Sequence, residues 1–156
     1  SVSPKSTKVP TPTRTPVAAK TEEPTPAPTA DGVQVATASA ADHFMAGQAY
    51  EQASSWDDAI SEYEQAVKLS AKTSSYRLAL GTAQFRGGKL QDAATTLSDI
   101  IEREPNNASA HRMLGLLFEA TGQGANACGE FQEYLRIKPL APDAGDIRTR
   151  LVRNGC

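Results

Sequence analysis

The sequence predicts an all-α fold, in which three helix-turn-helix repeats stack as an α-solenoid and a C-terminal helix caps them. The strongest evidence is that Gly47, Gly81 and Gly115 follow one another at intervals of 34 residues. The same interval relates three alanines and two prolines, namely Ala59, Ala93, Ala127, Pro105 and Pro139. A period of this length is typical of helical pairs that stack into an array. Such arrays present an extended surface to partners.

Residues 40–73, 74–107 and 108–141 can be laid over one another as three copies without a gap. The copies match a known repeat at Gly47, Tyr50, Trp56, Ala59, Tyr63 and Ala66, at Leu80, Gly81, Gly88, Ala93 and Pro105, and at Leu114, Gly115, Gly122, Ala127, Phe131 and Pro139. At these positions the chain resembles the tetratricopeptide repeat family, from residue 40 to about its end. The resemblance implies a right-handed α-solenoid.

Each matched residue type has a structural reason. Small residues such as Gly81 and Ala93 are expected where two helices cross closely, because a larger side chain would hold the backbones apart. Gly88 and Gly122 are expected in the turn inside a repeat, where glycine adopts a positive φ at little steric cost. The first copy has Ser54 at that turn, so it departs from the repeat pattern, as a terminal repeat of an array often does.

Apolar spacings of three and four residues predict the individual helices. We expect them at 40–53, 56–69, 74–86, 90–103, 108–121 and 124–137. A seventh, capping helix is expected at about 142–152, with Pro142 in its first turn and with Ile147 and Leu151 covering the third repeat. The predicted repeat domain therefore comprises residues 40–156.

Residues 1–39 have a different composition and are predicted to form a disordered, Pro/Thr-rich linker. Seven of the chain's ten prolines lie here: Pro4, Pro10, Pro12, Pro16, Pro24, Pro26 and Pro28. The segment has no aromatic residue, so it cannot bury enough apolar surface to offset its ordering entropy. An extended spacer is the main interpretation, and a proline-rich ligand for another domain is the alternative.

Charge and hydropathy exclude several classes of partner. The formal net charge is −2, and no basic stripe with interleaved aromatic residues occurs, which argues against nucleic acid. No apolar run is long enough to span a bilayer, so we expect no direct membrane insertion in this segment. The chain starts without an initiator methionine or a signal peptide, which suggests a fragment or a mature form. The spacer favours a periplasmic or exported protein, tethered to a membrane by a missing upstream segment; a cytoplasmic location is the alternative.

The two cysteines leave two interpretations open. Cys128 lies early in the second helix of the third copy, and Cys156 follows the capping helix. If these helices are antiparallel neighbours, Cys128 faces about Val152, and the chain end could fold back towards it. A disulfide would pin the capping helix and fit an oxidising compartment. The alternative is two unrelated thiols.

Motifs for chemistry are lacking in the sequence. His43 and His111 are separated by two repeat periods, so the repeat explains their positions without a metal. No phosphate-binding loop, zinc-protease motif or nucleophile elbow occurs. We therefore expect no enzyme, no cofactor and no metal site.

The family resemblance implies a concave wall built from the first helix of each repeat. The candidate partner-binding residues on it are Phe44, Met45, Gln48, Leu78, Thr82, Phe85, Arg86, Arg112, Met113, Leu116 and Glu119. One branch of the family grips acidic chaperone tails with Lys, Asn and Arg. At the matching places this chain has Phe44, Gln48, Ala79, Ser109 and Met113, which disfavours that ligand. The groove would instead have an apolar floor, which suits an amphipathic helix or an extended segment with apolar anchors. The residues of this floor are Phe44, Met45, Leu78, Phe85, Met113 and Leu116.

The predicted function is therefore a protein–protein interaction module that binds a protein or peptide in an apolar concave groove. Family habit places such modules in larger assemblies, such as envelope, secretion or motility complexes. One alternative is a self-assembling or structural spacer domain with weak self-association. Another is a regulatory appendage of a larger enzyme or receptor chain.

Overall fold

The computed structural model describes residues 37–156, which form seven α-helices and no strand. The helices are α1 (Ala40–Gln52), α2 (Trp56–Leu69), α3 (Ser74–Arg86), α4 (Leu90–Arg103), α5 (Ala108–Ala120), α6 (Gly124–Ile137) and α7 (Ala144–Arg153). The predicted all-α fold is confirmed. Nearly all of the predicted linker lies outside the described residues. No helix within 37–156 has both the length and the apolar character needed to cross a bilayer.

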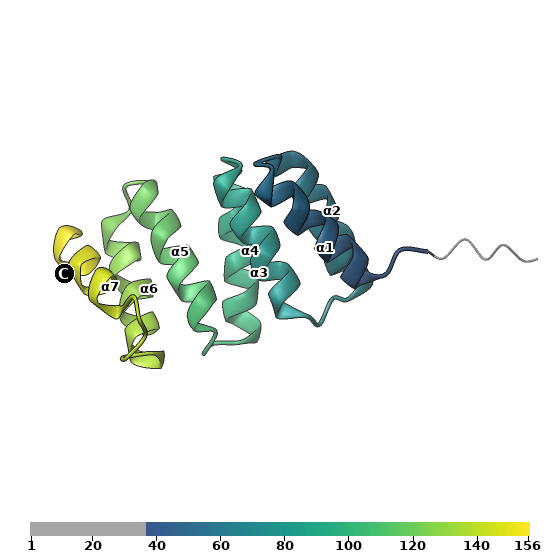
Figure 1. Cartoon of the computed structure of the whole chain (residues 1–156). Helices are drawn as coiled ribbons and strands as arrows, with labels where there is room; N and C mark the ends of the chain where they lie inside the picture. Colours follow the sequence, from purple (N-terminus) through teal and green to yellow (C-terminus); the bar gives the residue numbers. More distant parts are fainter. Residues whose placement is uncertain (1–36) are drawn as a thin grey trace, which may run out of the picture. The chain divides into compact units, whose positions relative to one another are not determined.

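The helices pack in sequential pairs. α1 contacts α2, α3 contacts α4, and α5 contacts α6, while each second helix also contacts the first helix of the next pair. Figure 1 shows these pairs side by side in chain order, with α7 beyond α6. α7 therefore takes the place of the first helix of a fourth pair.

The 34-residue step sets a large buried side chain against each repeated glycine. Tyr63, Leu97 and Phe131 share one position in their repeats and are fully buried. A Cβ added to Gly47 would lie 2.5 Å from Cε1 of Tyr63, and one added to Gly115 would lie 2.6 Å from Cε1 of Phe131. Real Cβ atoms do not approach that closely, so the close helix crossing requires glycine at both positions.

The four first helices, α1, α3, α5 and α7, end in the same kind of turn. Each turn contains one residue of positive φ: Ser54 at 58°, Gly88 at 78°, Gly122 at 72° and Gly155 at 85°. The next amide then bonds back into the helix, as the N–H of Cys156 does to the carbonyl of Leu151 at 3.0 Å. This pattern is the Schellman motif, which satisfies the last carbonyls of a helix. The turn that α7 shares with the others supports its place as the first helix of an incomplete pair.

α7 begins later than expected, at Ala144. Pro142 and Asp143 form a turn before it, closed by a hydrogen bond of 2.9 Å from the N–H of Ala144 to the carbonyl of Ala141. The prediction that Pro142 lies in the first turn of the helix is therefore wrong. Ile147 is fully buried in the third repeat's core, as a capping helix requires.

Candidate functional site on the first helices

The first helices lie nearer to one another than the second helices do. α3 contacts α5 directly, and Phe44 of α1 lies against Tyr76 of α3 with ring centroids 4.8 Å apart. Arg112 of α5 reaches Asp143 at the start of α7, with 2.5 Å between Nε and Oδ2. Within residues 37–156, no comparable contact joins α2 to α4 or α4 to α6. The inner layer of a curved stack is the one whose members lie closer together, so α1, α3, α5 and α7 form what we call the inner wall.

A hollow of about 350 Å³ opens on the inner wall between α1 and α3. It is lined by Gln48, Glu51, Gln52 and Arg86. The amides of Gln48 and Gln52 are exposed, and each offers donors and an acceptor to the backbone of a bound chain. The Arg86 side chain is 56% exposed and lies 3.7 Å from the carboxylate of Glu51. Exposed pairs of this kind are weak, which leaves the guanidinium available to an acidic group.

Glu51 is held in place from behind the inner wall. The hydroxyl of Tyr63 donates to its carboxylate at 2.9 Å. Burial, and then this carboxylate, raise the pKa of Tyr63, so the phenol stays neutral and remains a donor. Glu51 is absent from the predicted site residues. A count of three from Gln48 along the helix would have placed it on the inner wall.

The residues of the predicted apolar floor that lie in the middle of the inner wall are half-buried. Leu78, Phe85 and Met113 pack against the core between the second and third repeats. Phe44 packs against two tyrosine rings. The hydroxyl of Thr82 donates to the backbone carbonyl four residues earlier at 2.7 Å. These side chains have part of their surface in the core, and their role in binding stays a prediction.

Arg112 is already engaged at the other end of the wall. Asp143 accepts hydrogen bonds from the Arg112 guanidinium and from the hydroxyl of Tyr134. The Tyr134 hydroxyl first, and Arg112 second, hold the pKa of Asp143 below its usual value. Burial and the nearby carboxylate raise the pKa of Tyr134. This network fixes the start of α7 to α5 and α6.

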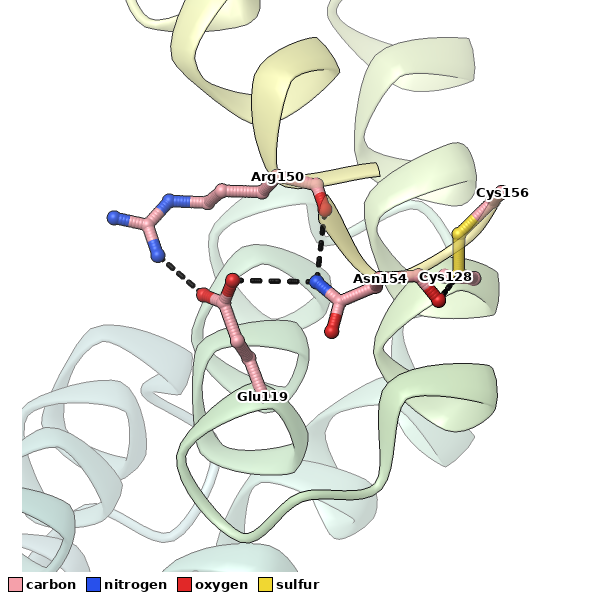
Figure 2. Close-up of a disulfide and its surroundings, with 5 residues drawn as sticks. All are labelled: Glu119, Cys128, Arg150, Asn154 and Cys156. Carbon is pink, nitrogen blue, oxygen red and sulfur yellow. Dashed lines mark hydrogen bonds and ion pairs between the residues drawn. A yellow bond between two sulfur atoms is a disulfide. The ribbon is translucent and has the colours of Figure 1, made fainter. Parts of the chain in front are cut away.

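Glu119 is likewise engaged with α7. Figure 2 shows its carboxylate accepting hydrogen bonds from Arg150 and from the side-chain amide of Asn154, the latter at 3.2 Å. Arg153 lies 3.7 Å from the same carboxylate. Leu116 is half-buried in the apolar cluster that α7 completes. α7 therefore covers the third-repeat part of the inner wall, and the candidate residues left open lie on α1 and α3.

Met45 belongs to a different surface. It is 59% exposed, and Tyr50 on the same helix is 40% exposed. The residues at the same repeat positions in α5, Met113 and Phe118, pack against the core of the preceding repeat. No preceding repeat lies within residues 37–156. We call the surface formed by Met45 and Tyr50 the open end.

The histidines pair with carboxylates across their repeats. Nδ1 of His43 lies 2.7 Å from Oε2 of Glu62, and Nδ1 of His111 lies 2.7 Å from Oε2 of Glu130. The two pairs are related by two repeat periods and tie α1 to α2 and α5 to α6. Sequence reasoning missed these acidic partners, although their common spacing of 19 residues was available. Within residues 37–156, no group of three or more His, Cys, Asp or Glu residues could hold a metal ion.

The structure pairs Cys128 of α6 with Cys156. Their Cα atoms are 6.2 Å apart, within the usual range for a disulfide. The turn at Gly155 brings the chain end back towards α6, and the bond fastens this end to the third repeat.

Comparisons with known proteins agree with this architecture. The family model described as "Tetratricopeptide repeat" matches residues 44–99 and 78–142. The TPR repeat-containing thioredoxin TTL4 of Arabidopsis thaliana is 25% identical over 103 residues, which are 66% of this chain and 14% of that protein. The chain thus spans only a small part of this relative's length.

Solved structures show the same fold. The first TPR domain of Spaghetti (RPAP3), bound to the HSP90 peptide SRMEEVD, has a TM-score of 0.68 and 17% identity, covering 80% of this chain and 100% of that chain. The TPR2B domain of yeast Sti1, in a pHsp70 complex, has a TM-score of 0.68 and 17% identity, covering 74% of this chain and 94% of that chain. Both are tetratricopeptide domains with a peptide or protein bound.

Proposed function

We propose that this chain, which belongs to the tetratricopeptide repeat family, is an interaction module that binds an extended segment of a partner protein along the inner wall of α1 and α3. The observation that carries the proposal is the open hollow between these helices, with Gln48, Gln52 and Arg86 exposed around it. The relatives that bind peptides support binding as the general role.

The lining suggests the chemistry of the bound segment. Gln48 and Gln52 would hydrogen-bond to its backbone, because amide side chains pair with peptide groups. Arg86 would meet an acidic side chain, and the half-buried Leu78 and Phe85 would receive an apolar one. Binding of this kind needs no covalent step. We place the module in a larger assembly, such as an envelope, secretion or motility complex.

Selection from a displayed library of random peptides would test the proposal on the full chain. We expect enriched peptides to carry an apolar and an acidic residue, and to lose binding when Gln48→Glu and Gln52→Glu are combined. The matched control changes Gln65→Glu and Gln91→Glu, which are exposed glutamines on α2 and α4. If the control variant loses binding to the selected peptides as the test variant does, or if both variants still bind them, the binding site does not lie on the inner wall.

Self-association is a second candidate, favoured by the open end. Met45 and Tyr50 are exposed at positions where the third repeat packs against a neighbour. A second copy of the chain could cover them, in a head-to-tail contact that repeats. Sedimentation of the full chain over a range of concentrations tests this, with Met45→Glu as the variant. Association that Met45→Glu abolishes would support it, and a monomer at all concentrations would exclude it.

A further inference from the structure

We propose that the Cys128–Cys156 disulfide is a reducible latch, which holds α7 over the third-repeat part of the inner wall until a dithiol opens it. The bond joins α6 to a residue just beyond the end of α7, across a sequence separation of 28. All of α7 lies inside the loop that it closes. Reduction removes this covalent constraint from α7. It breaks no contact within α1 to α5, because neither cysteine lies in these helices.

The local structure brings the chain end to Cys128. Gly155 adopts a φ of 85°, which turns the chain so that the N–H of Cys156 bonds to the carbonyl of Leu151. Gly124 at the start of α6 leaves room for this turn, because a Cβ there would lie 3.3 Å from Oδ1 of Asn154. The backbone turn at Gly155 and the absence of a side chain at Gly124 thus hold Cys156 close to Cys128.

Asn154 links the latch to the inner wall. Its side-chain amide donates to Glu119 and to the backbone carbonyl of Arg150, while its own backbone carbonyl lies 3.9 Å from Sγ of Cys128 (Figure 2). This last approach is a packing contact, since a sulfur in a disulfide carries no hydrogen. Asn154 therefore contacts both Cys128 and Glu119. When the disulfide breaks and Asn154 moves, Glu119 on the inner wall loses a hydrogen-bond donor.

Without the bond, the second half of α7 has few buried contacts. The helix has 10 residues, and isolated helices shorter than about 12–15 residues are marginal in water. The buried residues Ala144 and Ile147 both lie in its first half. In the second half Leu151 is half-buried against the third repeat, and Val152 is 79% exposed. Of the ion pairs of Glu119, the one with Arg153 is exposed on the arginine side and stabilises weakly, whereas the one with Arg150 is partly buried. The second half of α7 is therefore the part that the latch controls.

The bond is open to attack from solvent. Cys156 is exposed, whereas Cys128 is half-buried, so we assign Cys156 as the attacked sulfur. A thiolate of the dithiol bonds to Cys156, the bond to Cys128 breaks, and the Cys128 thiolate leaves and takes up a proton. The second thiol of the reagent then displaces Cys156 as a thiol. The dithiol is oxidised to its own disulfide and supplies both electrons.

Opening would change the charge and the extent of the inner wall. Glu119 would lose Arg150, Asn154 and Arg153 as partners and become a free carboxylate beside Leu116. A segment that extends from the α1–α3 hollow to this place would then meet a site for a basic side chain. This consequence rests on the proposed function, whereas the opening itself does not.

Hydrogen exchange followed by mass spectrometry tests the latch on the full chain, with dithiothreitol as the dithiol. We expect reduction to speed exchange of the amides in the second half of α7 by about tenfold or more and to leave α1 to α4 unchanged. The control is the double variant Cys128→Ser, Cys156→Ser, which should exchange fast in α7 with or without dithiothreitol. Unchanged α7 exchange on reduction of the native chain would overturn the proposal, and so would faster exchange in every helix. Neither result depends on whether a peptide binds.

Discussion

The ring of Phe131 occupies the space that a side chain at Gly115 would need, with only 2.6 Å between the nearest ring carbon and a Cβ built on the glycine. We expect Gly115→Ala to destabilise the domain by about 1–3 kcal/mol, because the added methyl group forces α5 and α6 apart. Urea unfolding followed by circular dichroism measures this change.

Gly129 provides the matched control within α6. It is exposed, and a Cβ there would meet nothing within 4 Å. Gly129→Ala should stabilise the domain by about 0.5–1 kcal/mol, because alanine loses less backbone entropy in a helix than glycine does. The same substitution is thus expected to have opposite signs at the two glycines. Stabilisation by both would show that the helix crossing tolerates a side chain.

Ser54 adopts a left-handed backbone, with φ at 58°, where the second and third repeats have Gly88 and Gly122. A non-glycine residue there costs about 1–2 kcal/mol of strain. Ser54→Gly should raise the free energy of unfolding by a net amount of about 0.5–1 kcal/mol, since glycine also gives the unfolded chain more freedom. Gly88→Ser should lower it. A neutral Ser54→Gly would mean that the turn is not strained.

The Asp143 network should make stability fall in acid. Tyr134 and Arg112 hold the pKa of Asp143 below its ordinary value of 3.8, so the folded state binds this proton less tightly than the unfolded state. The resulting stability is fully present above about pH 4 and is lost as the pH falls through the folded pKa. Asp143→Asn should therefore destabilise the domain at pH 7, by an amount that shrinks below pH 4. Equal destabilisation at pH 7 and in acid would exclude the carboxylate as its source.

Phe85 and Gln52 should respond differently to a glutamate. Phe85 is half-buried against the core, so Phe85→Glu should cost about 1–3 kcal/mol of stability as well as any binding. Gln52 is exposed, and Gln52→Glu should stay within about 0.5 kcal/mol of the native chain. The melting midpoints of the two variants in thermal unfolding measure this difference. An unchanged melting midpoint for Phe85→Glu would place that side chain outside the core.

The helices could be predicted from the sequence because each repeat supplies the same local signals. The 34-residue step identifies the crossing glycines and the turns. The predicted start of α7 is wrong, because Asp143 is held by Arg112 and Tyr134 from outside its own helix. The predicted inner wall did not separate open residues from covered ones. That separation depends on long-range pairs such as Glu119 with Arg150, which no local spacing encodes.

The most direct test of binding on the inner wall is to map a selected peptide on the full chain by amide chemical shifts in nuclear magnetic resonance. The peptide is titrated to saturation, and shifts are compared between first and second helices. We predict that the largest shifts occur around Gln48, Gln52 and Arg86, which line the hollow between α1 and α3. Largest shifts on α2 and α4, with that hollow unaffected, would contradict the proposed function.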